Sequence, residues 1–397
     1  METGSISLEP RGSAGEVLLA ALRLGTTSFG GPIAHIGYFR EEYVRRRRWL
    51  DDAAFSELVA LANVLPGPSS SQLGIAIGAL RAGRLGGLAA WVGFTLPSAV
   101  VMTALAYGVG RVDVADAGWL HGLELAAVAV VATAVVQLAR SLTPDLLRAS
   151  LAVLAGAIVL AVGGSAIQVV VIAGGALAGV ALLRGGARPA GVRIRFPVGG
   201  GLAVGALAGF AVLLVLLPVL ARAGGHGLET ASAFYRAGAL VFGGGHVVLP
   251  LLDAAVVAPG WVSQQEFLAG YGAAQALPGP LFAFSSYLGA VQEPEPNGVA
   301  GAAIATVAIF APSFLLLAGI GPLWSTFRAH PRVRAALAGV GAAVVGLLAA
   351  ALWNPVLTSS VDSVWDVLLA LVFVAALRVA PAWLVVAAAA AVGAAVL

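Results

Sequence analysis

The segment EVLLAALRLGTTSFGG at residues 16–31 returns in changed form as ETASAFYRAGALVFGG at residues 229–244. Both copies fit the pattern E-x6-R-x-G-x3-F-G-G, and each position of the second copy lies 213 residues after its partner. Self-similarity of this kind is the sequence sign of a duplicated structural unit. The segment therefore predicts a chain built from two related halves.

Further matches extend the duplication along the chain. The tetrapeptide LPGP occurs at residues 65–68 and at residues 277–280, and it follows Trp49 in the first half and Trp261 in the second at the same spacing. Two glycines, a proline and a serine also recur at a nearly constant offset: Gly83, Gly86, Pro97 and Ser98 match Gly298, Gly301, Pro312 and Ser313. We expect a first repeat over residues 14–197 and a second repeat over residues 198–397.

The composition places these repeats in a membrane. The 397 residues are 60% hydrophobic and 10% charged, whereas soluble domains carry about 25% charged residues. Such a chain has the bilayer as its solvent, so we expect an all-α, multi-pass integral membrane protein. The absence of cysteine excludes disulfides and thiolate metal sites, and we expect no cofactor. The net charge of +3 is no argument for nucleic acid, because the arginines lie mostly in short loops.

The loop charges predict that the two repeats are inserted in opposite orientations. Cytoplasmic loops are rich in arginine, and the first-repeat loops at residues 45–48 and 81–84 are basic. The matching loop before Trp261 has no arginine, and the matching loop at residues 292–297 contains two glutamates. An additional span at residues 201–220 passes the chain once more through the membrane, which inverts the second repeat. Inverted-topology repeats are a common architecture of secondary transporters.

Interrupted apolar segments predict re-entrant or broken helical hairpins. The apolar pieces on either side of residues 66–68 are about 12 residues each, which is shorter than the roughly 20 residues that a span requires. We expect a hairpin with its tip near the middle of the membrane. Residues 17–43 suggest a second hairpin, although one tilted span fits them too. Complete spans are expected at residues 88–110, 118–139, 149–163, 166–184, 201–220, 298–321, 335–353, 363–378 and 380–397.

The motifs together resemble the chromate ion transporter family in its two-domain form. They are FGGPIAH at residues 29–35, LPGP followed by Gln72, and LPS at residues 96–98. The second half has FGGGH at residues 242–246, LPGP again, and APS at residues 311–313. One departure is visible, because the counterpart of Gln72 is Phe284.

The resemblance implies a secondary transporter that exports chromate across the bacterial inner membrane, driven by the proton gradient or the membrane potential. The alternatives are a transporter of sulfate or another oxyanion with the same fold and, less favoured, an anion channel. A membrane-embedded enzyme is disfavoured because the chain has no H-E-x-x-H, G-x-S-x-G or Walker motif. Two fused halves are compatible with a monomer or a homodimer.

Chromate is a tetrahedral dianion that must exchange water for hydrogen-bond donors as it crosses the membrane. Helix N-termini offer unpaired N–H groups and partial positive charge, and glycine allows close approach of the backbone. We therefore expect the helix breaks to bind substrate, through Gly30, Gly31, Pro32, Pro66, Gly67, Pro68, Gly243, Gly244, Gly245, Pro278, Gly279 and Pro280. The alternative is that these residues serve only packing and kinking.

Polar residues beside the breaks complete the expected site. Asn63, Gln72 and Gln275 are expected to line it, with capping of the hairpin tip as the alternative. Membrane-embedded arginines are costly, and guanidinium groups suit oxyanions, so we expect Arg23 and Arg236 to contact the anion. Ion pairs with glutamates seven residues earlier, or snorkelling of the arginines to the membrane interface, are the alternatives. The candidates for coupling transport to protons are Glu16, His35, Glu229 and His246, with a structural, hydrogen-bonded histidine as the alternative.

Overall fold

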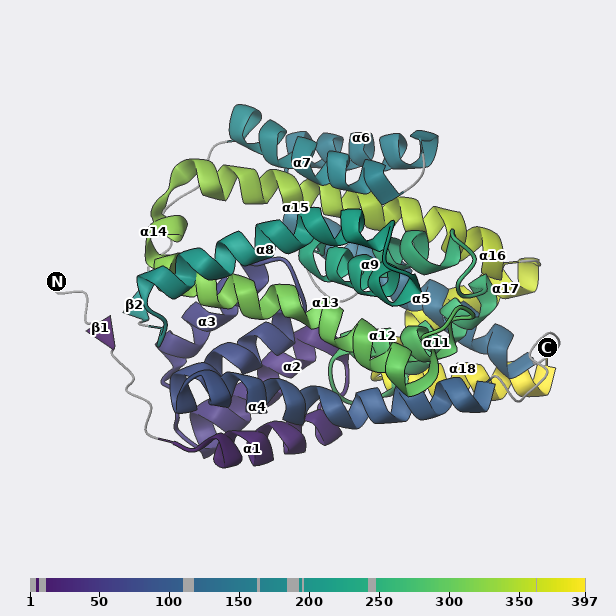
Figure 1. The fold of residues 1–397 in the computed structure, drawn as a ribbon. Coiled ribbons are helices and arrows are strands. Elements are labelled where there is room, and N and C mark those ends of the chain that lie inside the picture. The colour runs from purple at the N-terminus through teal and green to yellow at the C-terminus, as the bar shows by residue number, and fades with distance from the viewer. Residues whose placement is uncertain are drawn as a thin grey trace.

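The computed structural model describes residues 5–6, 12–109, 118–162, 165–183, 193–194, 196–241, 248–361 and 363–396. This part of the chain is helical except for one short parallel pairing between β1 (Ser5–Ile6) and β2 (Arg193–Ile194). The long helices lie alongside one another, with the N-terminus at one end of the molecule and the C-terminus at the other (Figure 1). The prediction of an all-α protein is confirmed.

The helices of the first half begin at Ala14. They are α1 (Ala14–Thr27), α2 (Gly31–Phe39), η1 (Arg40–Arg46), α3 (Asp52–Val64), α4 (Ser69–Val109), α5 (Gly118–Leu142), α6 (Leu146–Val162) and α7 (Ser165–Leu182). The breaks after α1 and α3 fall at the FGGP and LPGP motifs. In LPGP the proline removes a backbone donor and clashes with the preceding turn, which ends α3. In FGGP the chain breaks at Gly30 and Gly31, whose φ angles are positive, and Pro32 lies in the first turn of α2.

The second half repeats this order and adds short elements. It contains α8 (Gly200–Ala221), α9 (His226–Leu240), α10 (Val248–Leu252), η3 (Asp253–Val257), α11 (Gln264–Ala276), η4 (Leu281–Ala283), α12 (Phe284–Val291) and α13 (Gly298–Ile320). The remaining elements are η5 (Gly321–Leu323), α14 (Trp324–Ala329), α15 (Pro331–Ala351), η6 (Leu352–Leu357), α16 (Thr358–Ser360), α17 (Val364–Ala376) and α18 (Ala382–Val396). The matched E-x6-R segments lie on α1 and α9, and the matched LPGP motifs follow α3 and α11.

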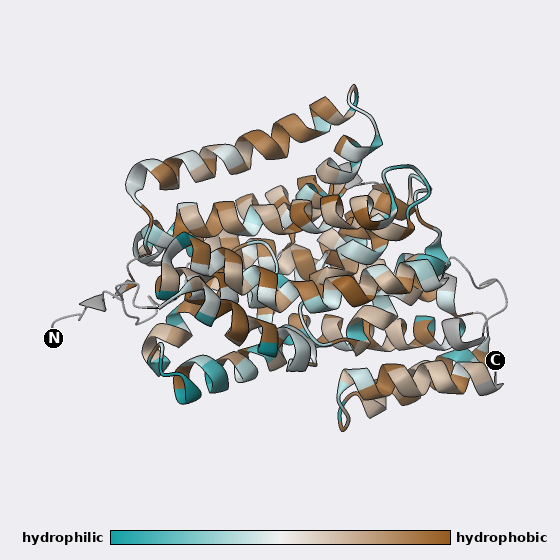
Figure 2. Cartoon of the chain, turned by 60° about the horizontal axis from the view of Figure 1, so that its bottom comes forward, coloured by the Kyte–Doolittle hydropathy of each residue, from teal (hydrophilic) through white to brown (hydrophobic). Residues whose placement is uncertain are grey.

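Five stretches of the described chain are long and apolar enough to cross a membrane. They are Ser69–Gly108, His121–Leu142, Gly200–Ala221, Gly298–Phe327 and Pro331–Asn354. The other expected spans form the shorter apolar helices α6, α7, α17 and α18. Hydrophobic residues predominate along the outer helices, whereas hydrophilic residues gather mostly toward the two ends of the molecule (Figure 2). The chain is a multi-pass membrane protein.

Helix α4 is interrupted near its first third, where the sequence predicts a loop. A straight helix of 41 residues would be about 60 Å long, twice the thickness of the hydrocarbon core. Ala82 and Gly83 are not helical, with φ of −140° and +67°. Beyond them the chain turns back on itself. Gly78 and Gly86 lie so close that a methyl group on Gly78 would collide with the carbonyl oxygen of Gly86. We call residues 69–81 the first part of α4 and residues 84–109 its second part.

The same close approach recurs in the second half. A methyl group on Gly289 of α12 would collide with the carbonyl oxygen of Gly301 in α13. Gly301 is the sequence counterpart of Gly86, and α12 and α13 correspond to the two parts of α4. The sequence duplication is therefore also a duplication of helix packing.

Candidate functional site

The two LPGP tips have the same backbone conformation. Gly67 and Gly279 have φ of +125° and +97°, a region that residues with a side chain rarely adopt. Each glycine separates a helix that ends from a helical segment that begins: α3 from α4, and α11 from η4. The predicted breaks at both tips are present.

Each tip is hydrogen-bonded to the opposite repeat. The Gly67 N–H donates to the carbonyl oxygen of Val241, with an N–O distance of 2.7 Å, and the Gly279 N–H donates to the carbonyl oxygen of Ser28 at 2.9 Å. Ser28 and Val241 occupy the same position of the repeat, directly before the FGG motifs. The two bonds are therefore reciprocal, which is the relationship that a pseudo-two-fold axis produces. We call the two meeting points the crossings.

A matched pair of serines lies against the same tips. A Cβ atom on Gly67 would lie 2.7 Å from the Ser313 hydroxyl oxygen, and one on Gly279 would lie 2.7 Å from the Ser98 hydroxyl oxygen. Ser98 and Ser313 close the LPS and APS motifs, which also match each other. Tips, FGG flanks and serines from residues far apart in the chain thus meet at the crossings.

The FGG segment is described in the first repeat only. Gly30 caps α2 in the left-handed conformation with φ of +92°, Gly31 has φ of +74°, and Pro32 lies in the first turn. The second-repeat segment, residues 242–247, lies outside the described residues. The predicted site residues Gly243, Gly244, Gly245 and His246 belong to it.

The predicted polar lining residues have different environments. Gln72 is buried, and its Nε2 donates to the Pro66 carbonyl at 2.6 Å and to the Ser313 hydroxyl at 3.3 Å. It therefore stabilises the tip. Gln275 is buried and hydrogen-bonded to Tyr271, whereas its counterpart Asn63 is exposed. These two residues, equivalent in sequence, are not equivalent in the structure.

His35 lies at the crossing that Gly279 forms. Its ring is 1% exposed, and Nε2 is 3.2 Å from the Ser28 carbonyl oxygen, which also accepts the Gly279 bond. The ring packs edge-on against Phe94, with 5.3 Å between the centroids. The Nδ1 atom has no hydrogen-bond partner in the described chain. His35 thus has the structural hydrogen bond that was one alternative, and retains one free nitrogen.

The first of the two matched arginines is exposed. The Arg23 side chain is 54% exposed and lies 3.7 Å from the Glu42 carboxylate. Its expected partner, Glu16, instead binds Arg81 at 3.1 Å and accepts a hydrogen bond from the Trp49 indole at 3.1 Å. The alternative of an Arg23–Glu16 pair is therefore wrong, because Arg81 from the second basic loop reaches Glu16.

The second matched arginine is half-buried and faces a cavity. Arg236 has no ion pair or hydrogen bond with any residue in the described ranges. The expected partner, Glu229, binds His226 at 3.0 Å, and the His226 ring packs edge-on against Trp261. An Arg236–Glu229 pair is thus not formed either.

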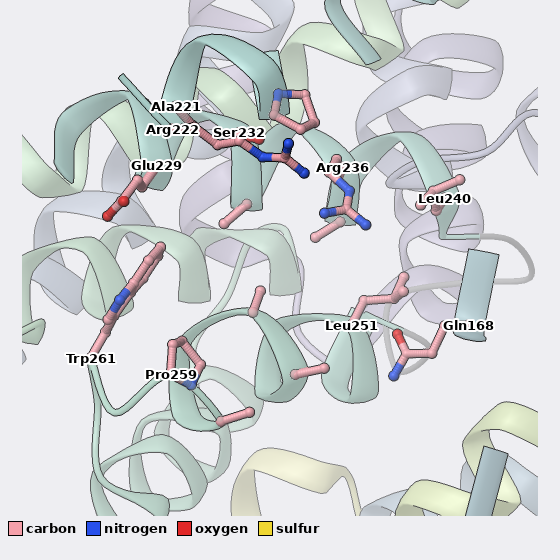
Figure 3. A pocket seen from close by; sticks show the side chains of 16 residues that line it. Gln168, Ala221, Arg222, Glu229, Ser232, Arg236, Leu240, Leu251, Pro259 and Trp261 are labelled. Atoms are coloured by element: carbon pink, nitrogen blue, oxygen red, sulfur yellow. The ribbon is translucent and has the colours of Figure 1, made fainter. Parts of the chain in front are cut away.

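The cavity in front of Arg236 has a volume of about 600 Å³ and lies between α8, α9 and the α10–η3 segment, with Gln168 contributed by α7. The guanidinium groups of Arg222 and Arg236 both point into it, while Glu229 and Trp261 line one end (Figure 3). With both arginines charged and Glu229 ionised, the lining has a net positive charge. Such a lining attracts anions.

Sequence reasoning did not find Arg222 or Gln168 as site residues. Arg222 lies just after α8, the helix expected only to pass the chain once more through the membrane, and Gln168 lies on a different helix, α7. Neither belongs to the repeated motifs. Trp261 could have been found from the sequence, because it is the counterpart of Trp49 in the duplication. Among the described residues, no group of three His, Asp or Glu side chains is placed to hold a metal ion.

Comparison with known proteins identifies the family. The family model for the chromate transporter matches residues 15–180 and 228–394. The chain is 28% identical to the chromate transport protein of Cupriavidus metallidurans, over 94% of this chain and 90% of that protein. It is 28% identical to the chromate transport protein of Pseudomonas aeruginosa, over 83% and 78%. No solved structure matches the chain. The chain belongs to the chromate transporter family, a family of transporters and not of enzymes.

Proposed function

We propose that this protein is a secondary transporter that exports chromate across the bacterial inner membrane, driven by the proton gradient or the membrane potential. The substrate class comes from the family, and relatives in Pseudomonas and Cupriavidus support a bacterial membrane. The observation that carries the proposal is Arg236, which has no ion pair or hydrogen bond with the described residues and faces a positively charged cavity.

The chemistry of Arg236 suits a tetrahedral dianion. An arginine inside a membrane protein is costly and is usually retained for function. Its planar fork of N–H groups matches two oxygens of an oxyanion, and a charge-assisted hydrogen bond is about twice as strong as a neutral one. The cavity, at about 600 Å³, has room for an oxyanion together with part of its water shell. Arg222 supplies a second charge on the same wall.

The reciprocal crossings support a mechanism of alternating access. Inverted repeats commonly form a site near the middle of the membrane and rock against each other. Here two backbone hydrogen bonds, Gly67 to Val241 and Gly279 to Ser28, join the repeats. The reciprocity of these bonds supports a pseudo-two-fold relation between the two repeats. The opposite charges of the matching loops favour an axis that lies in the membrane plane. The tip glycines and prolines and Gln72 line the path in this proposal.

Chromate uptake into everted membrane vesicles tests the proposal. The vesicles come from a host that lacks its own copy of this protein and expresses wild type, Arg236→Ala or Arg378→Ala. The control removes an exposed arginine beyond the end of α17. Loss of a charge-assisted hydrogen bond, about 1.5–3 kcal/mol, is expected to reduce uptake at low chromate about tenfold or more in Arg236→Ala only. Equal uptake by both variants at equal protein levels contradicts the role of Arg236.

Two further arms of the assay separate the alternatives. Uptake that stops when a protonophore collapses the gradient supports coupling, whereas uptake that follows the chromate gradient alone indicates a channel. Strong competition by sulfate, with accumulation of sulfate itself, identifies a broader oxyanion transporter. Vesicles containing wild-type protein that accumulate neither anion overturn the proposed function.

A further inference from the structure

The two crossings differ in chemistry although their backbones match. After the first tip the chain continues as Ser69, Ser70, Ser71 and Gln72. The matching residues after the second tip are Leu281, Phe282, Ala283 and Phe284. All eight side chains are buried. The first repeat thus places a polar helix start where the second repeat places an apolar one.

The residues that flank the tips show the same division. In the first repeat, Ser28, His35 and Thr95 are buried, with exposed fractions of 2% or less. Their counterparts in the second repeat are apolar and equally buried: Val241, Val248 and Phe310. The polar groups at both crossings therefore come mainly from the first repeat.

Contacts between the helices place these polar groups at one level of the molecule. Helix α1 and the second part of α4 run in the same direction, because Glu16 binds Arg81, which lies just before the second part begins, and Gly25 packs on the Phe94 backbone farther along. The first part of α4 runs back against the second, since Gly78 lies against Gly86. The start of α4 is consequently level with residues 95–98.

Side chains of α2 contact both parts of α4 at this level. The Phe39 ring lies 3.5 Å from the Cβ position of Gly74 and 5.1 Å, centroid to centroid, from Phe94. His35, one turn earlier on α2, contacts Phe94 and the Ser28 carbonyl. We call the start of α4 together with Ser28, His35 and Thr95 the polar layer.

Five buried polar atoms of this layer have no hydrogen-bond partner in the described part of the chain. They are Ser28 Oγ, His35 Nδ1, Ser71 Oγ, Gln72 Oε1 and Thr95 Oγ1. Buried polar side chains are normally paired, so each unpaired atom calls for an explanation. The first N–H groups of a helix are also without intrahelical partners, and Ser71 leans toward that end because helical side chains tilt to the N-terminus.

We propose that the polar layer is a second oxyanion-binding site on the transport path, separate from the cavity of Arg222 and Arg236, and that the duplicated chain has one such layer instead of two. The inference deepens the proposed function and rests on it. Hydroxyl and N–H donors from the start of α4, Ser28, His35 and Thr95 surround the tetrahedral dianion. Phe282, Phe284 and Phe310 of the second repeat form an apolar wall that excludes water.

Two threonines in similar surroundings, although not at equivalent positions of the repeat, test the site. Thr95 and Thr306 are both buried in helices, and each hydroxyl lacks a partner in the described structure. Thr95→Val removes one donor from the polar layer with little change of shape, and Thr306→Val makes the same change in the second repeat. We expect the KM for chromate in everted vesicles to rise about tenfold in Thr95→Val and in Ser71→Ala. Thr306→Val is expected to stay within twofold of wild type, and Thr95→Ser to retain most of the affinity.

A binding measurement keeps the inference separate from the proposed function. Purified protein is heated with and without chromate or sulfate, and the rise in melting temperature reports binding directly. Stabilisation of wild type and Thr306→Val, but not of Thr95→Val, supports the site even if vesicles transport neither anion. If Thr95→Val and Ser71→Ala bind and transport like wild type, the polar layer is not the site, and the proposed function still stands on wild-type uptake.

Discussion

At the scale of single residues, the tips depend on glycine for two reasons. Gly279 has a positive φ, and a Cβ atom there would lie 2.7 Å from the Ser98 hydroxyl oxygen and 3.2 Å from the Gly25 carbonyl oxygen. A side chain there meets both backbone strain and a collision. Gly67 is in the same situation against Gln72 and Ser313. The glycine of each tip motif is therefore required by the geometry of the contact between the two repeats.

Gly279→Ala is expected to destabilise the protein. The left-handed conformation costs an alanine about 1–2 kcal/mol, and overpacking adds about 1–3 kcal/mol. Thermal unfolding in detergent measures the loss as a lower melting temperature. The control is Gly205→Ala in α8, where a Cβ atom would meet nothing within 4 Å. A variant that melts with wild type contradicts the tight packing at the tip.

At the scale of elements, the close glycine pairs set how the helices turn back. Gly78 with Gly86, and Gly289 with Gly301, let two helical segments approach until backbone touches backbone. Small residues at such interfaces are a common way of packing membrane helices, which gain no hydrophobic driving force from one another in lipid. The pairs hold the hairpin arms that carry the tips.

Gly78→Ala and Gly289→Ala should therefore have similar effects. In each, the new methyl group must push a backbone carbonyl away, and we expect a loss of about 1–3 kcal/mol in the free energy of unfolding. Gly174→Ala in α7, with open space around it, serves as the control. Melting temperatures of the three purified variants provide the comparison. If only one hairpin responds, the two repeats do not share this packing.

At the scale of the whole molecule, an ionisable cluster joins the two halves away from the crossings. His121 of α5 lies with Nε2 3.1 Å from Asp366 of α17 and with Nδ1 3.4 Å from Glu124. The side chains of Glu124 and Asp366 are 7% and 3% exposed. Asp366 also accepts from the Ser363 N–H and hydroxyl at the start of α17. The cluster thus fixes a late helix to an early one.

His121→Ala is expected to lower stability by about 3 kcal/mol or more, because it leaves two buried carboxylates without the histidine between them. The double variant with Asp366→Asn should lose less than the sum of the single losses, since the residues act as a pair. Thermal unfolding of the four proteins gives the coupling energy. The exposed Arg40–Asp52 pair offers a control cycle with a much smaller coupling. Strictly additive losses would show that His121 and Asp366 do not interact.

The sequence alone determined much of the architecture. Apolar length predicted the spans in α5, α8, α13 and α15, because twenty apolar residues can satisfy their backbone in lipid only as a helix. Proline and glycine chemistry predicted the breaks at both LPGP tips, since those constraints act within a few residues. Internal comparison revealed the duplication, and the motifs pointed to the family that the comparisons then confirmed.

Only the tertiary structure decided how these pieces meet. The helices place Arg222 beside Arg236 at one cavity, give Glu16 to Arg81 and not to Arg23, and bring Ser28 against Gly279. Residues 28 and 279 are far apart in the chain, and no local propensity or spacing rule relates them. Equivalent positions also diverged, as Asn63 and Gln275 show. The physical reason is that contacts between helices depend on how each helix is rotated and shifted against its neighbours, which is a property of the assembled fold.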